Sequence, residues 1–127
     1  MIGISEVIKI HELLIDNFGG AKGLRDRNAL ESAINRPYAT FEKQDLYPTA
    51  KEQASAILES IIINHPFIDG NKRIGYVLMR LILLENGFDI KASVQDKYDF
   101  VIEISAGKKK FREIEIWIDK HLIKNAP

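Results

Sequence analysis

The sequence contains no cysteine in its 127 residues, which excludes a disulfide framework and any zinc site built from thiolates. It also has no excess of either charge, because 18 basic residues balance 18 acidic ones. A balanced chain is a poor candidate for nucleic-acid binding that depends on neutralising phosphates. The longest apolar run, 74–84, is interrupted by Arg80 and is too short to cross a bilayer.

The first residues, 1–6, lack the basic start and the continuous apolar run of a signal peptide. We therefore expect a cytoplasmic protein that binds neither a membrane nor nucleic acid. The hydrophobic fraction of 46% and the charged fraction of 28% are typical of a soluble globular protein. At this length the chain is expected to form one domain over residues 1–127.

Apolar residues at helical spacing, together with capping and stop signals, predict an all-α fold. The expected helices cover residues 6–18, 27–36, 50–64, 71–85, 94–105 and 111–124, with capping residues Ser5, Asp26, Thr49 and Ser93. The last segment alternates like a strand at 113–116, but its other apolar residues fit a helix better. The helix that begins at Asn71 is apolar around most of its circumference, which predicts that it is the central one. Residues 38–48 have no helical period and are expected to form an ordered loop or short hairpin.

The densest chemistry lies between the third and fourth helices, in the sequence His65-Pro-Phe-Ile-Asp69-Gly70-Asn71-Lys72-Arg73. N–H groups in the first turn of a helix have no intrahelical acceptors and favour anions, so this turn predicts a phosphate site. A carboxylate beside bound phosphate calls for a cation, and Mg²⁺ is the usual one. The histidine is the group suited to take a proton near neutral pH. Together these features suggest general-base attack of a hydroxyl on a nucleotide phosphate.

Each of these residues also has an ordinary explanation when it is taken alone. His65 can be structural, Asp69 can cap a helix, and the two cations can be solvated charges. Phe67 and Ile68 are expected to pack into the core and pin the loop. His11 and His121 are expected to have structural or surface roles. These separate explanations do not account for the concentration of polar groups in one loop.

The nine residues HPFIDGNKR resemble the signature of the Fic/Doc superfamily, and they agree with it at every fixed position. The upstream stretch GLRDRNALESAINRP and the downstream stretch LLENGFDI are similar to the death-on-curing (Doc) toxins within it. The resemblance runs from about Ile4 to Ile90. It implies a helical bundle around a central buried helix, with the active-site loop at the N-terminus of that helix.

The resemblance also implies site residues and substrates for a transfer from ATP to a protein hydroxyl. His65 would be the base, Asp69 would hold Mg²⁺, and Arg73 would act with them in catalysis. Phosphate ligands would come from Gly70, Asn71, Lys72 and Arg73. The loop 38–48 would be the flap that pairs with the target segment. Its contact residues would be Tyr38, Phe41, Leu46 and Tyr47.

Two positions bear on which phosphate is attacked. The AMP-transferring branch of the family has glycine where this chain has Lys72, and arginine where it has Tyr76. In Doc-like members this change accompanies transfer of the γ-phosphate, so we expect a protein Ser/Thr kinase activity. The implied target is a threonine of elongation factor Tu, whose phosphorylation inhibits translation. The alternatives are an AMP-transferase and a catalytically silent binding or regulatory module.

Inhibition is expected to come from a partner chain. Autoinhibited members of the family carry Ser/Thr-x-x-x-Glu-Gly/Asn, and the nearest string here, from Ser55 to Ser60, fails at its last position. The Doc resemblance therefore implies a toxin–antitoxin system with a small antitoxin. Such a partner would inhibit through a segment that folds on binding.

Overall fold

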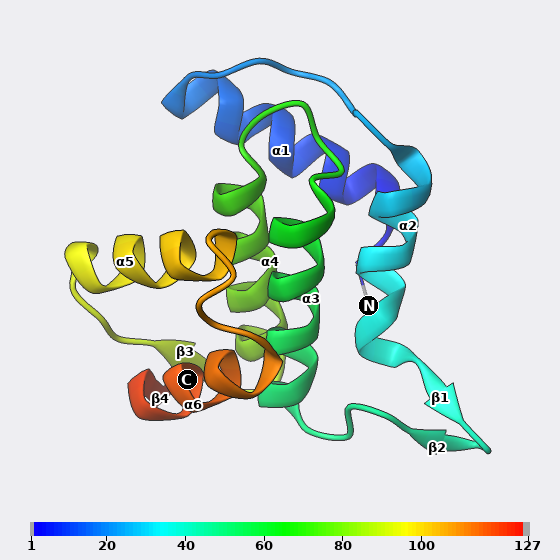
Figure 1. The fold of residues 1–127 in the computed structure, drawn as a ribbon, viewed down its shortest axis with the longest axis vertical. Helices are drawn as coiled ribbons and strands as arrows, with labels where there is room; N and C mark the ends of the chain where they lie inside the picture. The colour runs from blue at the N-terminus through cyan, green and yellow to red at the C-terminus, as the bar shows by residue number, and fades with distance from the viewer. Residues whose placement is uncertain (1, 126–127) are drawn as a thin grey trace.

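The computed structural model of the chain describes residues 2–125, and over this range it is built from helices with four short strands (Figure 1). The α-helices are α1 Ile4–Phe18, α2 Arg27–Asn35, α3 Ala50–Asn64, α4 Asn71–Glu85, α5 Val94–Ser105 and α6 Phe111–His121. A 3₁₀ turn, η1, covers Arg36–Tyr38. The strands are β1 Thr40–Phe41, β2 Gln44–Asp45, β3 Phe88–Ile90 and β4 Leu122–Lys124. The expected all-α fold is confirmed.

The centre of the fold is an antiparallel pair formed by α3 and α4 (Figure 1). On α4, Ile74, Leu78 and Ile82 face the core, which confirms the central position predicted for this helix. α3 shares that position, since every residue from 54 to 62 except Glu59 is buried. The two helices approach closely at Gly75, where an added Cβ would lie 3.3 Å from the side chains of Ile61 and Leu58.

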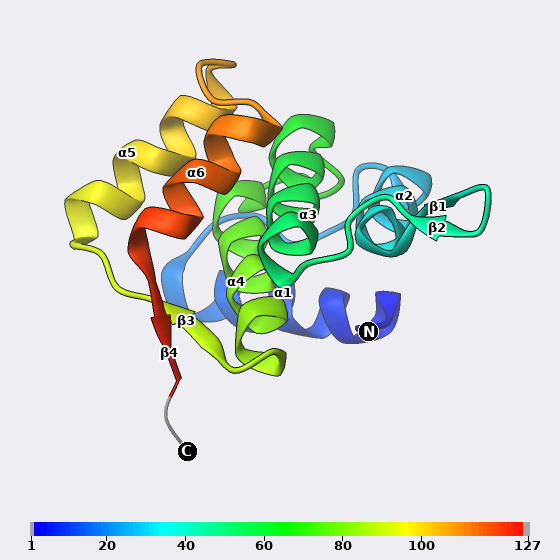
Figure 2. The same cartoon turned by 90° about the horizontal axis from the view of Figure 1, so that it is seen from below.

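The other helices cover this pair on different sides. Seen from below, α5 and α6 lie together on one side, and α2 with the β1–β2 hairpin lies on the other (Figure 2). α1 packs across α4 and contributes Val7 and Ile15 to the buried residues. α5 and α6 are joined by a stack in which the rings of Phe100 and Trp117 are 3.8 Å apart. No helix within residues 2–125 is both long enough and apolar enough to cross a bilayer.

Local signals predicted most helix ends correctly. Asp26, Thr49 and Ser93 each accept a hydrogen bond from a backbone N–H of the helix they precede. Ser5 does not cap α1, because the helix begins at Ile4, two residues earlier than expected, with Gly3 as its N-cap. Gly3 N–H donates to Glu6 Oε1 (3.4 Å). α2 is followed directly by η1, because Arg36 keeps helical backbone angles despite the proline after it.

One expectation for the C-terminal third was wrong. The last helix ends at His121 instead of continuing to 124. Residues 122–124 form β4, which pairs antiparallel with β3, so that Ile90 lies opposite Leu122 and Phe88 opposite Lys124. The backbone groups of residues 122–124 bond to β3 instead of to a further helical turn. The apolar spacing of the segment does not reveal this distant partner.

The segment 38–48 contains a short hairpin, which is one of the two forms expected for it. Its turn residues, Glu42 and Lys43, both have positive φ, as two-residue hairpin turns require. The hairpin joins the N-terminal end of α3, whereas the loop 65–70 joins the C-terminal end (Figure 1). The 15 residues of α3 separate the two by about 22 Å.

The assignment of Tyr38, Phe41, Leu46 and Tyr47 as flap residues that contact a target segment stays a prediction. Phe41 and Leu46 are exposed on the projecting hairpin. Tyr47 packs back on the body, where its hydroxyl accepts from Arg36 Nε (3.1 Å) and its ring meets Phe111. Tyr38 is half-buried, and this burial raises the pKa of its hydroxyl.

Candidate active site

The loop 65–70 begins where His65 ends α3 in the left-handed conformation, with φ of 48°. This turn leaves the His65 side chain exposed at the end of the helix. Nδ1 of the ring lies 3.2 Å from the carbonyl oxygen of Ile63. Because a carbonyl oxygen only accepts, Nδ1 carries the hydrogen in this contact, and Nε2 of the neutral ring is left with a free lone pair.

Asn71 holds the loop closed from the first position of α4. Its Oδ1 accepts from Phe67 N–H (3.0 Å) and its Nδ2 donates to Phe67 O (2.9 Å). Asn71 is 7% exposed, and the Phe67 side chain is buried in the core as expected. The side chain of Asn71 therefore belongs to the loop itself, and only its backbone N–H remains for a phosphate.

Ile68 does not share the buried position of Phe67, and the expectation that both pack into the core was wrong. Its side chain is 59% exposed. Phe67 forms an isolated antiparallel bridge with Leu24, and consecutive side chains of an extended segment point to opposite sides. With Phe67 directed into the core, Ile68 faces outward and lies over Gly23, where an added Cβ would be 3.1 Å from Ile68 Cδ1.

His11, on α1, contacts the middle of the loop and holds it in place. It is buried, its ring stacks on Phe67 with centroids 3.8 Å apart, and its Nε2 donates to the carbonyl oxygen of Asp69 (2.7 Å). Gly70 has φ of +76°, and a Cβ there would lie 3.4 Å from His11 Nε2 and 3.2 Å from Ile15 Cδ1. Of the structural and surface roles expected for His11, the structure shows the structural one, because this buried side chain positions the loop.

The segment 19–26, which joins α1 to α2, borders the loop. Arg25 donates from Nε to His65 O and from Nη2 to Asn64 O, both at 2.6 Å. The backbone N–H groups of Arg25 and Asp26 donate to Pro66 O, and Ile68 N–H donates to Gly23 O. A glycine-rich stretch with one arginine is a weak signal, because all of these contacts join residues far apart in the sequence.

Arg25→Lys is expected to loosen the loop with little loss of overall stability. A lysine has no fork with which to bond two carbonyl oxygens, but both bonds lie at the surface, so we expect a cost of about 1 kcal/mol. Amide hydrogen exchange should become faster at residues 65–69 and stay unchanged in the middle of α4. Arg27→Lys, which alters only a surface pair with Glu31, is the matched control. If amides 65–69 exchange at the same rate in both variants, Arg25 does not anchor the loop.

Asp69 presents an ionised carboxylate at the surface of the loop. Its Oδ2 accepts from Ala21 N–H (3.1 Å) and its Oδ1 from Gly70 N–H (2.8 Å), and these bonds lower the pKa of the carboxyl group. Each oxygen keeps a further lone pair. Residues 2–125 contain no cluster of three or more His, Cys, Asp or Glu side chains able to hold a metal. A single carboxylate such as that of Asp69 suits Mg²⁺, which is commonly bound by one or two carboxylates together with phosphate oxygens.

Two cations and an apolar groove follow at the start of α4. Lys72 and Arg73 are exposed, and the guanidinium of Arg73 lies 4.7 Å from the ring centroid of Phe18. Both line a groove of about 310 Å³ between α4 and α5, whose walls include Tyr76, Tyr98 and Val101. The Tyr76 hydroxyl is buried without an acceptor among the described residues, and burial raises its pKa to about 12. Tyr76 therefore presents a neutral wall to the groove.

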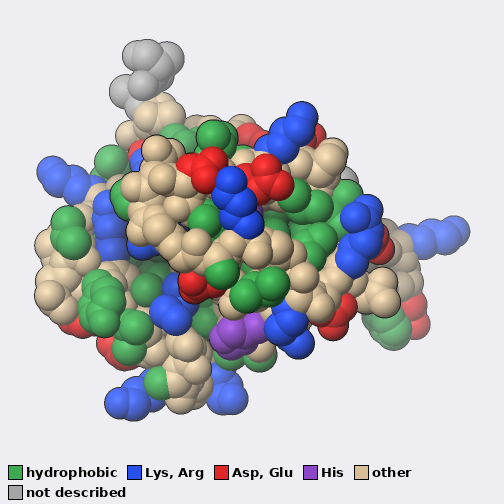
Figure 3. Space-filling model, turned by 90° about the horizontal axis from the view of Figure 1, so that it is seen from above, with side chains coloured by type: hydrophobic (Ala, Val, Ile, Leu, Met, Phe, Trp, Pro, Cys, Tyr) green, Lys and Arg blue, Asp and Glu red, His purple; other side chains and the backbone are tan. Residues whose placement is uncertain are grey.

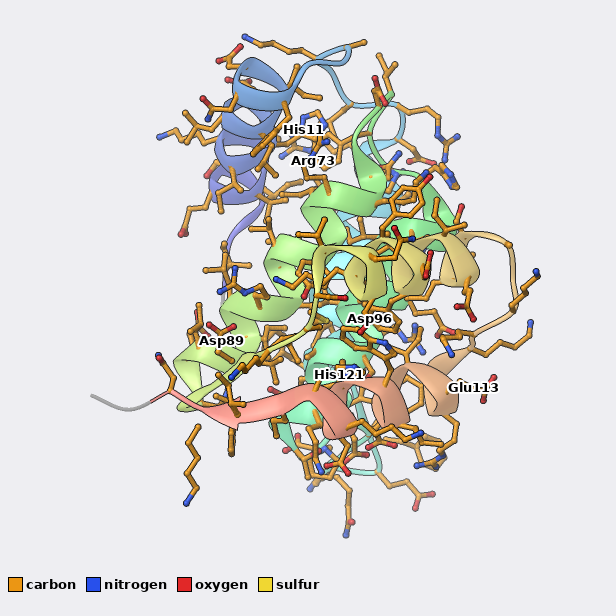
Figure 4. All side chains as sticks on the ribbon, turned by 90° about the vertical axis from the view of Figure 1, so that its left-hand side faces the viewer. His11, Arg73, Asp89, Asp96, Glu113 and His121 are labelled. Carbon is orange, nitrogen blue, oxygen red and sulfur yellow. The ribbon has the colours of Figure 1, made fainter. Side chains whose placement is uncertain are left out.

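The end of the molecule that carries the loop shows exposed histidine with lysine and arginine side chains around it and a hollow beside it (Figure 3). His11 and Arg73 lie together at this end, and His121 lies well away from them (Figure 4). His121 donates from Nδ1 to Trp117 O (2.7 Å) and stacks on that ring, so it is a packing histidine as expected. The structure thus brings His65, Asp69, Lys72 and Arg73 to one end.

A helical fold with this loop between α3 and α4 corresponds to a known family. Residues 2–83 match the Fic/DOC family, and the chain belongs to it. A curated relative, "Toxin Doc" of Mycolicibacterium smegmatis, is 39% identical over 75 residues. That match covers 59% of this chain and 58% of the relative, so the chain spans less than two thirds of the relative's length.

Proposed function

We propose that this protein is a Doc-like toxin of a toxin–antitoxin system that transfers the γ-phosphate of ATP to a Ser or Thr hydroxyl of a target protein. The observation that carries the proposal is the groove wall after the loop, where Lys72 and Arg73 are followed by a neutral Tyr76. Lysine in place of glycine adds bulk and charge beside the phosphate site. Tyrosine in place of arginine removes a clamp for the outer phosphates of an AMP-transferring arrangement.

The side chains of the loop divide the reaction between them. His65 takes the proton of the acceptor hydroxyl on Nε2, while its Nδ1–H stays bonded to Ile63 O. The acceptor oxygen attacks the γ-phosphorus, the bond from that phosphorus to the β–γ bridging oxygen breaks, and ADP leaves with the electron pair. Backbone N–H groups of residues 71–73 and the Lys72 and Arg73 side chains hold the phosphates.

Asp69 is the residue that would hold Mg²⁺, with phosphate oxygens completing the coordination. The ion would offset negative charge on the phosphates. The apolar part of the groove, with Tyr76 and Tyr98 in its walls, is suited to the nucleotide base.

The partners are proposed on the same basis. The target is a threonine of elongation factor Tu, whose modification would inhibit translation in the cytoplasm. The inhibitor is a small antitoxin with a segment that folds on binding. Support comes from the name of the relative, "Toxin Doc", and from Glu59. Glu59 of the nearest internal inhibitory string is paired with Arg36 (2.9 Å) within a regular helix.

An AMP-transferase is the second candidate, because His65, Asp69 and Arg73 suit attack on either phosphate. The mass of the modified target decides between them when the protein is incubated with ATP, magnesium and elongation factor Tu. A phosphoryl increment is expected. An adenylyl increment would exclude the kinase, and no increment from a folded sample would favour a silent binding module.

The double variant Lys72→Gly/Tyr76→Arg is expected to shift the product from phosphorylated toward adenylylated target, since it restores the residues of the AMP-transferring branch. The fraction of each product is read by mass spectrometry of the intact target. Lys97→Ala, which removes another cation that lines the same groove, is the matched control and should leave the product unchanged. An unchanged product in the double variant would show that these two positions do not select the phosphate.

A further inference from the structure

A second cavity, of about 290 Å³, lies on α3 directly before the loop. It is bounded by α3 on one side and by the turn between α5 and α6 on the other, with Ser60, Asn64, Gly107 and Lys110 in its lining. It shares no lining residue with the groove between α4 and α5. Asn64, in the lining of this cavity, immediately precedes the proposed base His65 in the chain.

Arg36 and Ser60 give this cavity hydrogen-bond donors that the protein does not use. Arg36 Nη1 donates to Glu59 Oε1 and to Ser60 Oγ, both at 2.9 Å, and Nε donates to Tyr47. Within residues 2–125, Nη2 of Arg36 and the Ser60 hydroxyl hydrogen have no acceptor. Ser60 is 6% exposed, and because its oxygen already accepts from Arg36, its hydroxyl hydrogen is free to donate to a ligand. An oxygen ligand would satisfy both groups.

The charge at the cavity favours an anionic oxygen. Glu59 is the acidic side chain in the lining, and its charge is balanced by its pair with Arg36 (2.9 Å). Lys109 makes a loose pair with Glu103 (3.5 Å), and Lys110 has no ion-pair partner among the described residues. The lining therefore carries a positive excess. The exposed side chain of Ile63, which also lines the cavity, adds an apolar contact.

We infer that this cavity binds an acidic side chain of the target segment whose hydroxyl is presented to His65. The inference rests on the proposed transfer, because it assigns the acceptor to the α3 side of His65 and leaves the α4 side to the nucleotide. It names the substrate class as a hydroxyl-bearing segment with a carboxylate a few residues from the acceptor. A segment held in this way keeps its hydroxyl beside Nε2 of His65.

Binding is measured without ATP, so the result does not depend on the transfer. The probe is a synthetic peptide with a central threonine flanked by aspartates and glutamates, titrated into ¹⁵N-labelled protein. Saturable shifts are expected at the amides of Ser60, Asn64 and Gly107. The isosteric peptide with asparagine and glutamine should bind about tenfold more weakly, and weakening by added salt should be seen only for the acidic peptide.

Lys110→Glu is expected to weaken binding of the acidic peptide about tenfold, because it reverses a charge in the lining. Lys108→Glu makes the same change in the same turn but outside the lining, and should bind as the unaltered protein does. No shifts, shifts centred on the Tyr76 groove, or equal affinity of the two variants would overturn the inference. Equal binding of inorganic phosphate would also overturn it, by showing a general anion site.

Different results would disprove the proposed phosphoryl transfer and the proposed acidic-peptide site. If the acidic peptide binds at the cavity but receives no phosphoryl group from ATP, the transfer is wrong and the acidic-peptide site remains. If the peptide is phosphorylated at equal rates by the protein and by the Lys110→Glu variant, the transfer holds and the acidic site is wrong.

Discussion

His65→Asn is expected to lower the rate of phosphoryl transfer by about 10²–10⁴-fold, the range that a positioned general base contributes. Asparagine removes the basic Nε2 but tolerates the left-handed backbone that His65 adopts at φ 48°. Because the side chain is exposed, the free energy of unfolding should change by less than about 0.5 kcal/mol. The rate is measured with purified target, and stability by chemical denaturation.

The matched control for this variant is His121→Asn, which removes a histidine far from the loop (Figure 4). It should leave the transfer rate unchanged. Full toxicity of the His65→Asn variant on expression would exclude His65 as the base, provided that the variant is folded.

Asn71→Ala is expected to destabilise the protein by about 2–6 kcal/mol, because it leaves two buried backbone groups of Phe67 without partners at about 1–3 kcal/mol each. The same change should abolish transfer, since the loop loses the contacts that hold it against α4. Both effects are measured, the first by denaturation and the second with purified target at a temperature where the variant is folded.

Asn86→Ala is the control at the other end of α4. Its amide donates a single bond to Ile82 O (2.8 Å) at an exposed residue, so the loss should stay near 1 kcal/mol. Asn71→Asp keeps the acceptor for Phe67 N–H but places an oxygen against Phe67 O, and it should be no more stable than the alanine variant. Near-equal losses at Asn71 and Asn86 would contradict the closing role of Asn71.

Features that depend on neighbouring residues were predictable from the sequence. The capping residues Asp26, Thr49 and Ser93 act within one turn of their helices, so their positions follow from local chemistry. The loop from His65 to Arg73 was found for the same reason, since its residues are adjacent in the chain.

Features that depend on distant partners were not predictable. The contacts of segment 19–26 with the loop join residues about 40 positions apart, and nothing local marks Arg25 as a clamp. The strand at 122–124 exists only because β3 offers a partner. The hairpin 38–48 was identified, but its distance from the loop depends on the direction of α3. These cases share long-range pairing, which a single sequence does not encode in any short pattern.

The bond from His11 to Asp69 joins residues 58 positions apart and makes the loop depend on how α1 is seated. α3 and α4 are neighbours in the chain and share most of the core, so they keep their pairing if α1 detaches. Local opening of one element costs less free energy than global unfolding. Opening of α1 alone would separate His11 from Asp69 and Phe18 from Arg73 in one step, so the loop would lose both contacts before the centre of the fold unfolds.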